Sequence, residues 1–210
     1  MLQINIVEKK YKDQVVLKEA NFHILQNGIY GIVGKNGQGK TTLFKCILGF
    51  EPFEGSCTFD NKKIVLQDVA WCPAESPIYE ELSPAEFYTF YCSILGIENN
   101  QSPKLFDVPE DKLVKEFSTG MKKKAFLNAL FQKDYPVYIL DEPFNGLDIE
   151  ANYILMNYLK EKAQYSIVLI SSHILDVLFT NCLRIFVVNK TTISAYDKEE
   201  YNEIPAKLFG

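Results

Sequence analysis

A glycine-rich segment that carries one lysine and one threonine, residues 34–41 (GKNGQGKT), fits the pattern G-x-x-x-x-G-K-[ST]. Glycines in such a turn let backbone N–H groups point inward and cradle phosphate oxygens, and the N-terminus of a following helix favours negative charge. We expect Lys40 to reach the β- and γ-phosphates and Thr41 to ligate Mg²⁺. The pattern predicts a site for a nucleoside triphosphate, made by Gly34, Lys35, Asn36, Gly37, Gln38, Gly39, Lys40, Thr41 and Thr42.

Two adjacent carboxylates follow the apolar run at residues 137–140 (VYIL). Asp141 and Glu142 therefore stand at the carboxyl end of a predicted buried strand, and ligands of open α/β sheets bind at that edge. We expect Asp141 to hold Mg²⁺, through a water molecule, and Glu142 to orient and polarise the attacking water. Together with Lys40, these side chains predict hydrolysis of the bound triphosphate.

Strands and helices alternate around these motifs. Residues 1–34 predict strands that run into Gly34, and residues 41–49 predict a helix directly after the glycine-rich segment. From residue 136 the order is a strand, a helix (149–163), a strand (166–171), a helix from about residue 174 and a strand (183–188). Residues 189–190 then predict a hairpin turn. This alternation predicts a parallel sheet in an α/β domain.

A proline- and charge-rich segment, residues 51–117, interrupts the alternation. Within it, Ser83 and Glu86 form a capping box with Pro84 at the first helical position, which predicts a helix that runs to Gly96. We find no linker between two independent domains. The chain is therefore predicted as a single domain, residues 1–210, with an insertion at about residues 75–118.

Composition excludes several classes of protein. The 22 Lys and Arg residues against 27 Asp and Glu residues give a net charge of −5, so we expect no nucleic-acid partner. The apolar runs have the length of strands, far short of the roughly 20 residues that cross a bilayer, and the opening residues do not fit a signal peptide. Five cysteines without paired spacing favour a reduced, cytoplasmic compartment, and we expect no stable metal besides Mg²⁺ with the nucleotide.

Five motifs in this sequence resemble, in order and approximate spacing, those of the ATPase subunits of ATP-binding cassette (ABC) transporters. They are residues 40–41 (KT), 117–121 (FSTGM), 141–143 (DEP), 145–148 (NGLD) and 171–173 (SSH). The resemblance covers nearly the whole chain. It implies a P-loop NTPase core with a mostly parallel sheet, an N-terminal antiparallel β subdomain and a short inserted α-helical subdomain.

The resemblance also implies roles for residues outside the two motifs analysed first. Tyr11 matches the aromatic residue that stacks on adenine, and His173 matches the histidine that hydrogen-bonds the γ-phosphate. Ser118, Thr119 and Gly120 match the segment that contacts ATP bound to a second copy of the subunit, and Asp148 matches the aspartate that couples the two sites across that dimer. Ser118 also fits the N-cap of a predicted helix, a position that favours anions.

The sequence departs from the family pattern at three places. Ala74 stands where family members carry a glutamine, so either Glu75 substitutes as a Mg²⁺ ligand or sensing at this position is weakened. Thr119 and Met121 form a variant that we associate with export. The lysines at 122–124 favour a solvated helix face, or alternatively a surface that attracts phosphates or lipid headgroups.

The resemblance implies an ATP-binding and ATP-hydrolysing subunit, peripheral on the cytoplasmic face of the membrane, that pairs with a second copy in a homodimer. It would power a separate integral membrane permease, with export favoured, through the helical subdomain. Candidate residues for the docking groove are Ile78, Tyr79, Phe87, Tyr88 and Tyr91, and the alternative, which the helical spacing of the aromatic residues favours, is that they belong to the core. Two alternatives stay open at this point. One is a soluble ATPase of the same type that acts on a cytosolic protein complex, and the other is a slow nucleotide-dependent regulator.

Overall fold

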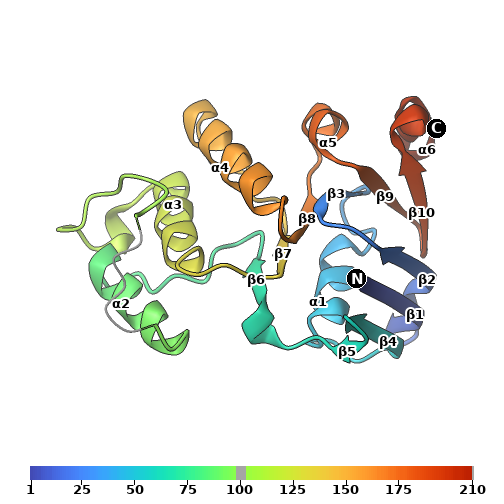
Figure 1. Ribbon diagram of the computed structural model, residues 1–210, viewed down its shortest axis with the longest axis horizontal. Coiled ribbons are helices and arrows are strands. Elements are labelled where there is room, and N and C mark those ends of the chain that lie inside the picture. Colours follow the sequence, from blue (N-terminus) through green and yellow to red (C-terminus); the bar gives the residue numbers. More distant parts are fainter. Residues whose placement is uncertain (98–102, 210) are drawn as a thin grey trace.

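The computed structural model describes residues 1–97 and 103–209 and contains two sheets with helices packed around them (Figure 1). Sheet B has the strand order β10-β9-β3-β8-β7-β6, in which β10 alone runs antiparallel to its neighbour. Its strands are β3 (Gly28–Val33), β6 (Val69–Cys72), β7 (Val137–Leu140), β8 (Ile167–Ser171), β9 (Arg184–Asn189) and β10 (Thr192–Asp197). The predicted, mostly parallel sheet is confirmed.

Sheet A is antiparallel and has the strand order β2-β1-β4-β5. It consists of β1 (Leu2–Tyr11), β2 (Gln14–Ile24), β4 (Glu54–Phe59) and β5 (Lys62–Lys63). The predicted N-terminal antiparallel subdomain is confirmed, but half of its strands come from the segment in which we predicted only interrupted alternation. Every residue of β4 is at least partly exposed, so a two-residue hydrophobic period is weak there.

The helices are distributed over both faces of sheet B. They are α1 (Lys40–Ile47), α2 (Pro84–Ile94), α3 (Thr119–Leu130), α4 (Ile149–Lys162), α5 (Leu175–Asn181) and α6 (Ile204–Phe209), with short 3₁₀ turns at Leu66–Asp68, Val114–Glu116 and Lys198–Glu203. In Figure 1, α4 and α5 lie on one side of the strands, and α1 with sheet A lies on the other. No helix in residues 1–97 and 103–209 combines the length and apolarity that a membrane span requires.

Alternate residues of the central strands bury their side chains in two different cores. In β7, Val137 and Ile139 belong to the core that includes α1 and sheet A, whereas Tyr138 and Leu140 belong to the core that includes α3 and α4. All four side chains are almost fully buried. A strand that is covered on both faces needs apolar residues at every position, which explains the continuous run VYIL.

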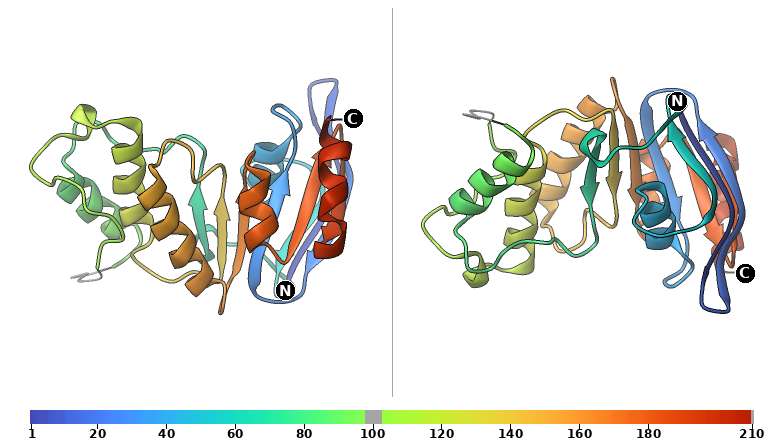
Figure 2. Two further views of the ribbon diagram at one scale, coloured as in Figure 1. Left: turned by 90° about the horizontal axis from the view of Figure 1, so that it is seen from above. Right: turned by 90° about the horizontal axis from the view of Figure 1, so that it is seen from below.

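The segment between β6 and β7 forms a lobe that contains α2 and α3, and Figure 2 shows this lobe and sheet A at opposite ends of the molecule. The predicted capping box is confirmed, because the Ser83 hydroxyl accepts a hydrogen bond from Glu86 N at 3.3 Å and Ser83 N donates to the Glu86 carboxylate at 2.8 Å. Phe87 is buried and packs its ring 6.5 Å from that of Phe126 in α3. Phe87 thus belongs to the core of the lobe, which excludes it from the docking groove and confirms the alternative that its helical spacing favoured.

The turn at the edge of sheet B is one residue later than predicted. Asn189 still pairs with Thr192 in the ladder, so the turn consists of Lys190 and Thr191 instead of residues 189–190. Lys190 adopts a left-handed conformation with φ of 54°. Asparagine is a common residue in such turns, which is why the sequence favoured Asn189.

Candidate functional site

The predicted phosphate loop, residues 34–41, joins the end of β3 to the start of α1. The buried Lys40 ammonium turns back into the loop, where it donates hydrogen bonds to the Gly34 carbonyl at 2.7 Å and the Lys35 carbonyl at 3.4 Å. Gly39 caps α1 in a left-handed conformation (φ 103°), and no side chain caps the first-turn amides of that helix. A cation and free helix amides beside one turn suit a bound polyphosphate.

Close contacts explain two of the glycines in the phosphate loop. A Cβ atom on Gly34 would stand 2.5 Å from the Val188 carbonyl oxygen in β9, and one on Gly39 would meet the Val16 side chain in β2 at 3.0 Å. The loop is therefore held between both sheets. Its middle residues, Lys35, Asn36 and Gly37, are exposed, Thr42 is half-buried, and the Gln38 side chain accepts a hydrogen bond from Lys190 N.

The two residues predicted to hold Mg²⁺ lie next to each other. The Thr41 hydroxyl donates to Asp141 Oδ2 at 2.5 Å, although the two residues are 100 positions apart in the chain. Asp141 is only 1% exposed, and its other oxygen, Oδ1, accepts a hydrogen bond from the Ser171 hydroxyl at 2.6 Å. Hydroxyl and carboxylate oxygens are the donors that Mg²⁺ prefers, and the ion usually takes its remaining ligands from phosphates and water, so these residues fit the ion.

Glu142 and His173 also meet at this edge of sheet B. His173 Nδ1 lies 3.0 Å from Glu142 Oε2, and His173 N donates to the same oxygen at 3.4 Å. Glu142 has a left-handed backbone with φ of 48°, and its amide donates to the Ser171 hydroxyl at 2.8 Å. A non-glycine residue holds such a conformation only when its surroundings impose it. The Glu142 carboxylate is thus aimed by its own backbone, which Ser171 at the end of β8 holds, and by His173, which follows that strand.

Ser118 and Asp148 begin two neighbouring helices. The Ser118 hydroxyl caps α3 by accepting from Met121 N at 3.3 Å, as predicted, and the Asp148 carboxylate caps α4 by accepting from Ala151 N at 2.8 Å. The Lys124 ammonium, 2.6 Å from the Asp148 carboxylate, lowers the pKa of this carboxyl group, as does the cap. A Cβ atom on Gly120 would lie 2.3 Å from the Gly146 carbonyl oxygen. Only glycine lets the start of α3 approach residues 145–148 so closely.

Tyr11 and Glu75 lie at the margin of this constellation. Tyr11 ends β1 and is 42% exposed, and the Lys9 ammonium stands 4.2 Å from the centre of its ring. Across the hairpin it pairs with Gln14, two residues before the Val16 that contacts Gly39. Glu75 is exposed on the loop after β6, and among the described residues its side chain has no hydrogen bond or ion pair.

The lysines at 122–124 do not form a solvated face, so the favoured interpretation is wrong. Lys122 pairs with Glu80 at 2.5 Å, Lys124 pairs with Asp148, and Lys123 is 3% exposed. The Lys123 ammonium donates to the carbonyl oxygens of Ala74 and Glu142. Consecutive residues of a helix project about 100° apart, so the three side chains point in different directions. Their partners lie in two loops, residues 73–83 and residues 141–148.

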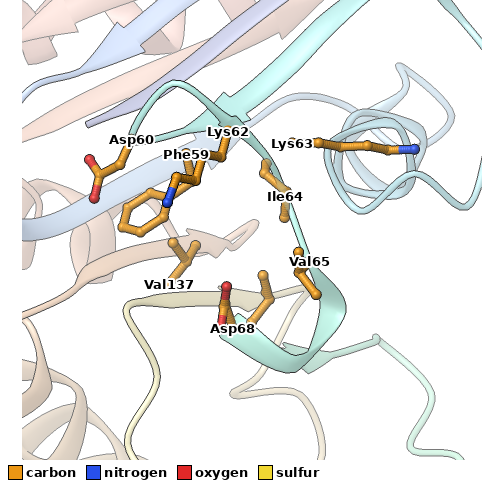
Figure 3. Close-up of a pocket in the computed structure, with 9 residues that line it drawn as sticks. Phe59, Asp60, Lys62, Lys63, Ile64, Val65, Asp68 and Val137 are labelled. Carbon is orange, nitrogen blue, oxygen red and sulfur yellow. The ribbon is translucent and has the colours of Figure 1, made fainter.

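Sequence reasoning assigned no individual role to Ser171 and interpreted Lys123 only as one of three surface lysines, although both contact Glu142 directly. Ser171 ends β8 beside the end of β7, so its position in the sheet was the available signal. A cavity of about 230 Å³ lies elsewhere: it is lined by residues 59–60, 62–65 and 68–69 and by Val137 (Figure 3). Because Val69 and Val137 begin their strands, this cavity lies at the opposite end of β6 and β7 from Asp141.

Comparisons with known proteins agree with this arrangement. The family model described as ABC transporter matches residues 17–145. The lantibiotic transport ATP-binding protein SrtF of Streptococcus pyogenes is 30% identical over 186 residues, which cover 84% of this chain and 81% of that protein. The ABC-type transporter ATP-binding protein EcsA of Bacillus subtilis is 28% identical over 212 residues, covering 93% and 86%.

Solved structures share the fold. One described as the ATP binding subunit of an ABC transporter has a TM-score of 0.87 at 24% identity and covers 100% of this chain and 95% of its own. Another, an ATP-binding cassette in a dimeric post-hydrolysis state bound to ADP and Pi, has a TM-score of 0.81 at 17% identity and covers 94% and 99%. The family model covers more than half of the chain, and the chain therefore belongs to the ABC transporter family.

Proposed function

We propose that this chain binds ATP with Mg²⁺ and hydrolyses it at the edge of sheet B. One observation carries the proposal: the pair Thr41–Asp141 and the pair Glu142–His173 lie side by side at the ends of β7 and β8. Bound Mg²⁺ would neutralise charge on the phosphates. Lys40 holds the β- and γ-phosphates, Asp141 orients Thr41, Glu142 positions and polarises the attacking water, and His173 holds the Glu142 carboxylate in place and contacts the γ-phosphate.

We further propose that two copies enclose the nucleotide between them. Ser118, Thr119 and Gly120 at the start of α3 would contact ATP held by the partner, and Asp148 would couple the two sites. The apolar side chain of Ile149, next to Asp148 in the chain, is 89% exposed, which supports a contact surface at this place. The solved structure of an ATP-binding cassette bound to ADP and Pi is dimeric, which supports a dimer as well. Tyr11 supplies an exposed ring for adenine.

The partner driven by this cycle is proposed to be an integral membrane permease, which places the chain on the cytoplasmic face of a membrane. Names of relatives support transport and favour export, namely the lantibiotic transport protein SrtF and a Nod factor export protein of Burkholderia pseudomallei. Tyr79, Phe90 and Ile94 of the helical lobe are 56%, 41% and 64% exposed and offer an apolar contact for that partner.

Replacing Glu142 by glutamine tests the hydrolytic assignment. Glu142→Gln keeps the shape of the side chain, so we expect ATP to bind normally, turnover to fall by about 10² to 10⁴-fold, and the dimer to accumulate. The matched control is Glu161→Gln on the exposed last turns of α4, which should leave turnover unchanged. Turnover is read by phosphate release, and the dimer by light scattering with ATP. Native turnover in Glu142→Gln would refute the role of Glu142.

A specific observation favours one alternative, a slow nucleotide-dependent regulator. Ala74 has no polar side chain, and the exposed Glu75 side chain has neither an ion pair nor a hydrogen bond within the described residues, so no protein contact holds a Mg²⁺ ligand in place at this position. A turnover well below one per minute by the intact native chain, with ATP bound tightly, would support this alternative. Co-purification with a soluble complex instead of a membrane protein would favour the cytosolic ATPase.

A further inference from the structure

Lys123 is a buried cation for which the proposed mechanism has no use. It lies in the second turn of α3 and is 3% exposed. Its ammonium group donates to the Ala74 carbonyl at 3.2 Å and to the Glu142 carbonyl at 3.4 Å. Within residues 1–97 and 103–209, no carboxylate oxygen lies within 4.0 Å of it. The group is therefore held by two main-chain oxygens that belong to different loops.

A buried ammonium group that lacks a carboxylate partner contributes little to the stability of the fold. Desolvation of the charge is costly, and hydrogen bonds to neutral carbonyl groups return only part of that cost. Its two neighbours in sequence have ordinary partially exposed partners, Glu80 and Asp148. Of these three lysines only Lys123 is buried, which indicates that it holds the surrounding loops in position.

The backbone conformation of Glu142 requires contacts that hold it in place. Its left-handed conformation, φ 48°, is unfavourable for a glutamate and must be imposed from outside. Ser171 fixes the amide side of this residue, through the hydrogen bond from Glu142 N at 2.8 Å. Lys123 contacts the other side, the carbonyl group, which also accepts a long hydrogen bond from Asn145 N at 3.3 Å. Together these groups fix the peptide units on both sides of the Glu142 Cα atom.

We propose that Lys123 is a positioning residue for hydrolysis, which ties the Glu142 backbone and the loop at Ala74 to helix α3. The inference rests on the proposed function, since Glu142 is the residue it positions. The N-terminus of α3 carries Ser118 and Gly120, five and three residues before Lys123. A displacement of α3 therefore moves the support of the Glu142 carboxylate as well as the predicted contact to the partner's ATP. Lys123 makes hydrolysis depend on the position of α3.

Lys123→Met tests the inference, because methionine has a similar length but no N–H donors. Lys122→Met is the matched control, since it removes a neighbouring cation of the same helix whose partner, Glu80, lies outside the site. We measure kcat for ATP, the dissociation constant of ATP, and hydrogen exchange of the segment 141–146. For Lys123→Met we expect kcat to fall by about ten- to a hundredfold, the dissociation constant to stay within about threefold, and exchange in this segment to accelerate.

Lys123→Gln distinguishes a role for the N–H donors of Lys123, which position Glu142, from a requirement for any long side chain that fills this buried place. Glutamine keeps an N–H donor, so we expect it to recover part of the lost kcat and of the lost protection. A kcat for Lys123→Met within twofold of the Lys122→Met value, or a loss of kcat that merely follows a loss of ATP affinity, would overturn the inference. Unfolding of both Lys123 variants would also overturn it, since the role would then be structural. If the native chain does not hydrolyse ATP, the proposed function fails, yet hydrogen exchange still decides whether Lys123 holds residues 141–146.

Discussion

Ser171→Ala removes one hydroxyl that joins Asp141, predicted to hold Mg²⁺, to Glu142, predicted to be catalytic. That hydroxyl donates to Asp141 Oδ1 at 2.6 Å and accepts from Glu142 N at 2.8 Å. Both hydrogen bonds disappear together, and alanine has no group to replace them. The change leaves a buried carboxylate, 1% exposed, with the Thr41 hydroxyl as its remaining side-chain partner among the described residues.

The cost follows from the type of partner. A hydrogen bond to a charged group contributes about 1.5–3 kcal/mol, and an amide donor left without a partner costs about 1–3 kcal/mol more when it is buried. Glu142 N is partly buried, so we discount its share and expect a total loss of about 2–4 kcal/mol in the free energy of unfolding. Because Glu142 also loses an anchor for its left-handed backbone, we expect kcat to fall about tenfold, which corresponds to ~1.4 kcal/mol in the barrier.

Ser166→Ala is the matched control. Ser166 precedes the same strand, β8, and its buried hydroxyl donates at 2.7 Å to a neutral group, the Tyr135 carbonyl, at the end of the strand away from the site. It should cost about 1 kcal/mol and leave kcat unchanged. Urea titration measures the free energy of unfolding, and phosphate release measures kcat. Equal losses of stability in both variants, or a native kcat in Ser171→Ala, would refute this reasoning.

Two further predictions concern the dimer contact and the pH dependence of stability. Gly120→Ala should abolish ATP-dependent dimerisation in light scattering while the monomer stays folded, because its Cβ would stand 2.3 Å from the Gly146 carbonyl oxygen and push α3 away; a native dimer would contradict this. The Lys9 ammonium, 2.9 Å from the Glu51 carboxylate, lowers the pKa of Glu51 below its ordinary 4.5. The ion pair therefore stabilises the fold above pH 4.5, and this stabilisation is lost as the pH falls through the lower pKa of the folded state. The native protein should therefore have a higher melting temperature than Glu51→Gln at pH 7, and this difference should disappear below pH 4.5. A difference in melting temperature that persists to pH 3 would exclude this cause.

The core fold could be predicted because its signals are local. Residues 34–41 report their own conformation through glycine and lysine, and the strands at 137–140 and 167–171 are apolar at every position, as burial on both faces demands. The strand β4 was missed because its partner, β1, lies more than 40 residues away in the chain. The strand β5 pairs with β4 and is only two residues long, too short to show a pattern. Long-range pairing of partly exposed residues leaves almost no pattern within one segment.

The site shows the same division between local and distant causes. Asp141 and Glu142 could be assigned from the strand that precedes them, but the partners of Lys123 are main-chain oxygens, which every residue has and no sequence pattern reports. A run of three lysines on a helix is normally solvated, since burying an ammonium is costly. Here the fold brings loops from β6 and β7 against α3, and only the middle lysine points between them. The proposed role of Lys123 therefore depends on the direction in which its side chain leaves the helix. The fold determines that direction, and the residue type alone does not reveal it.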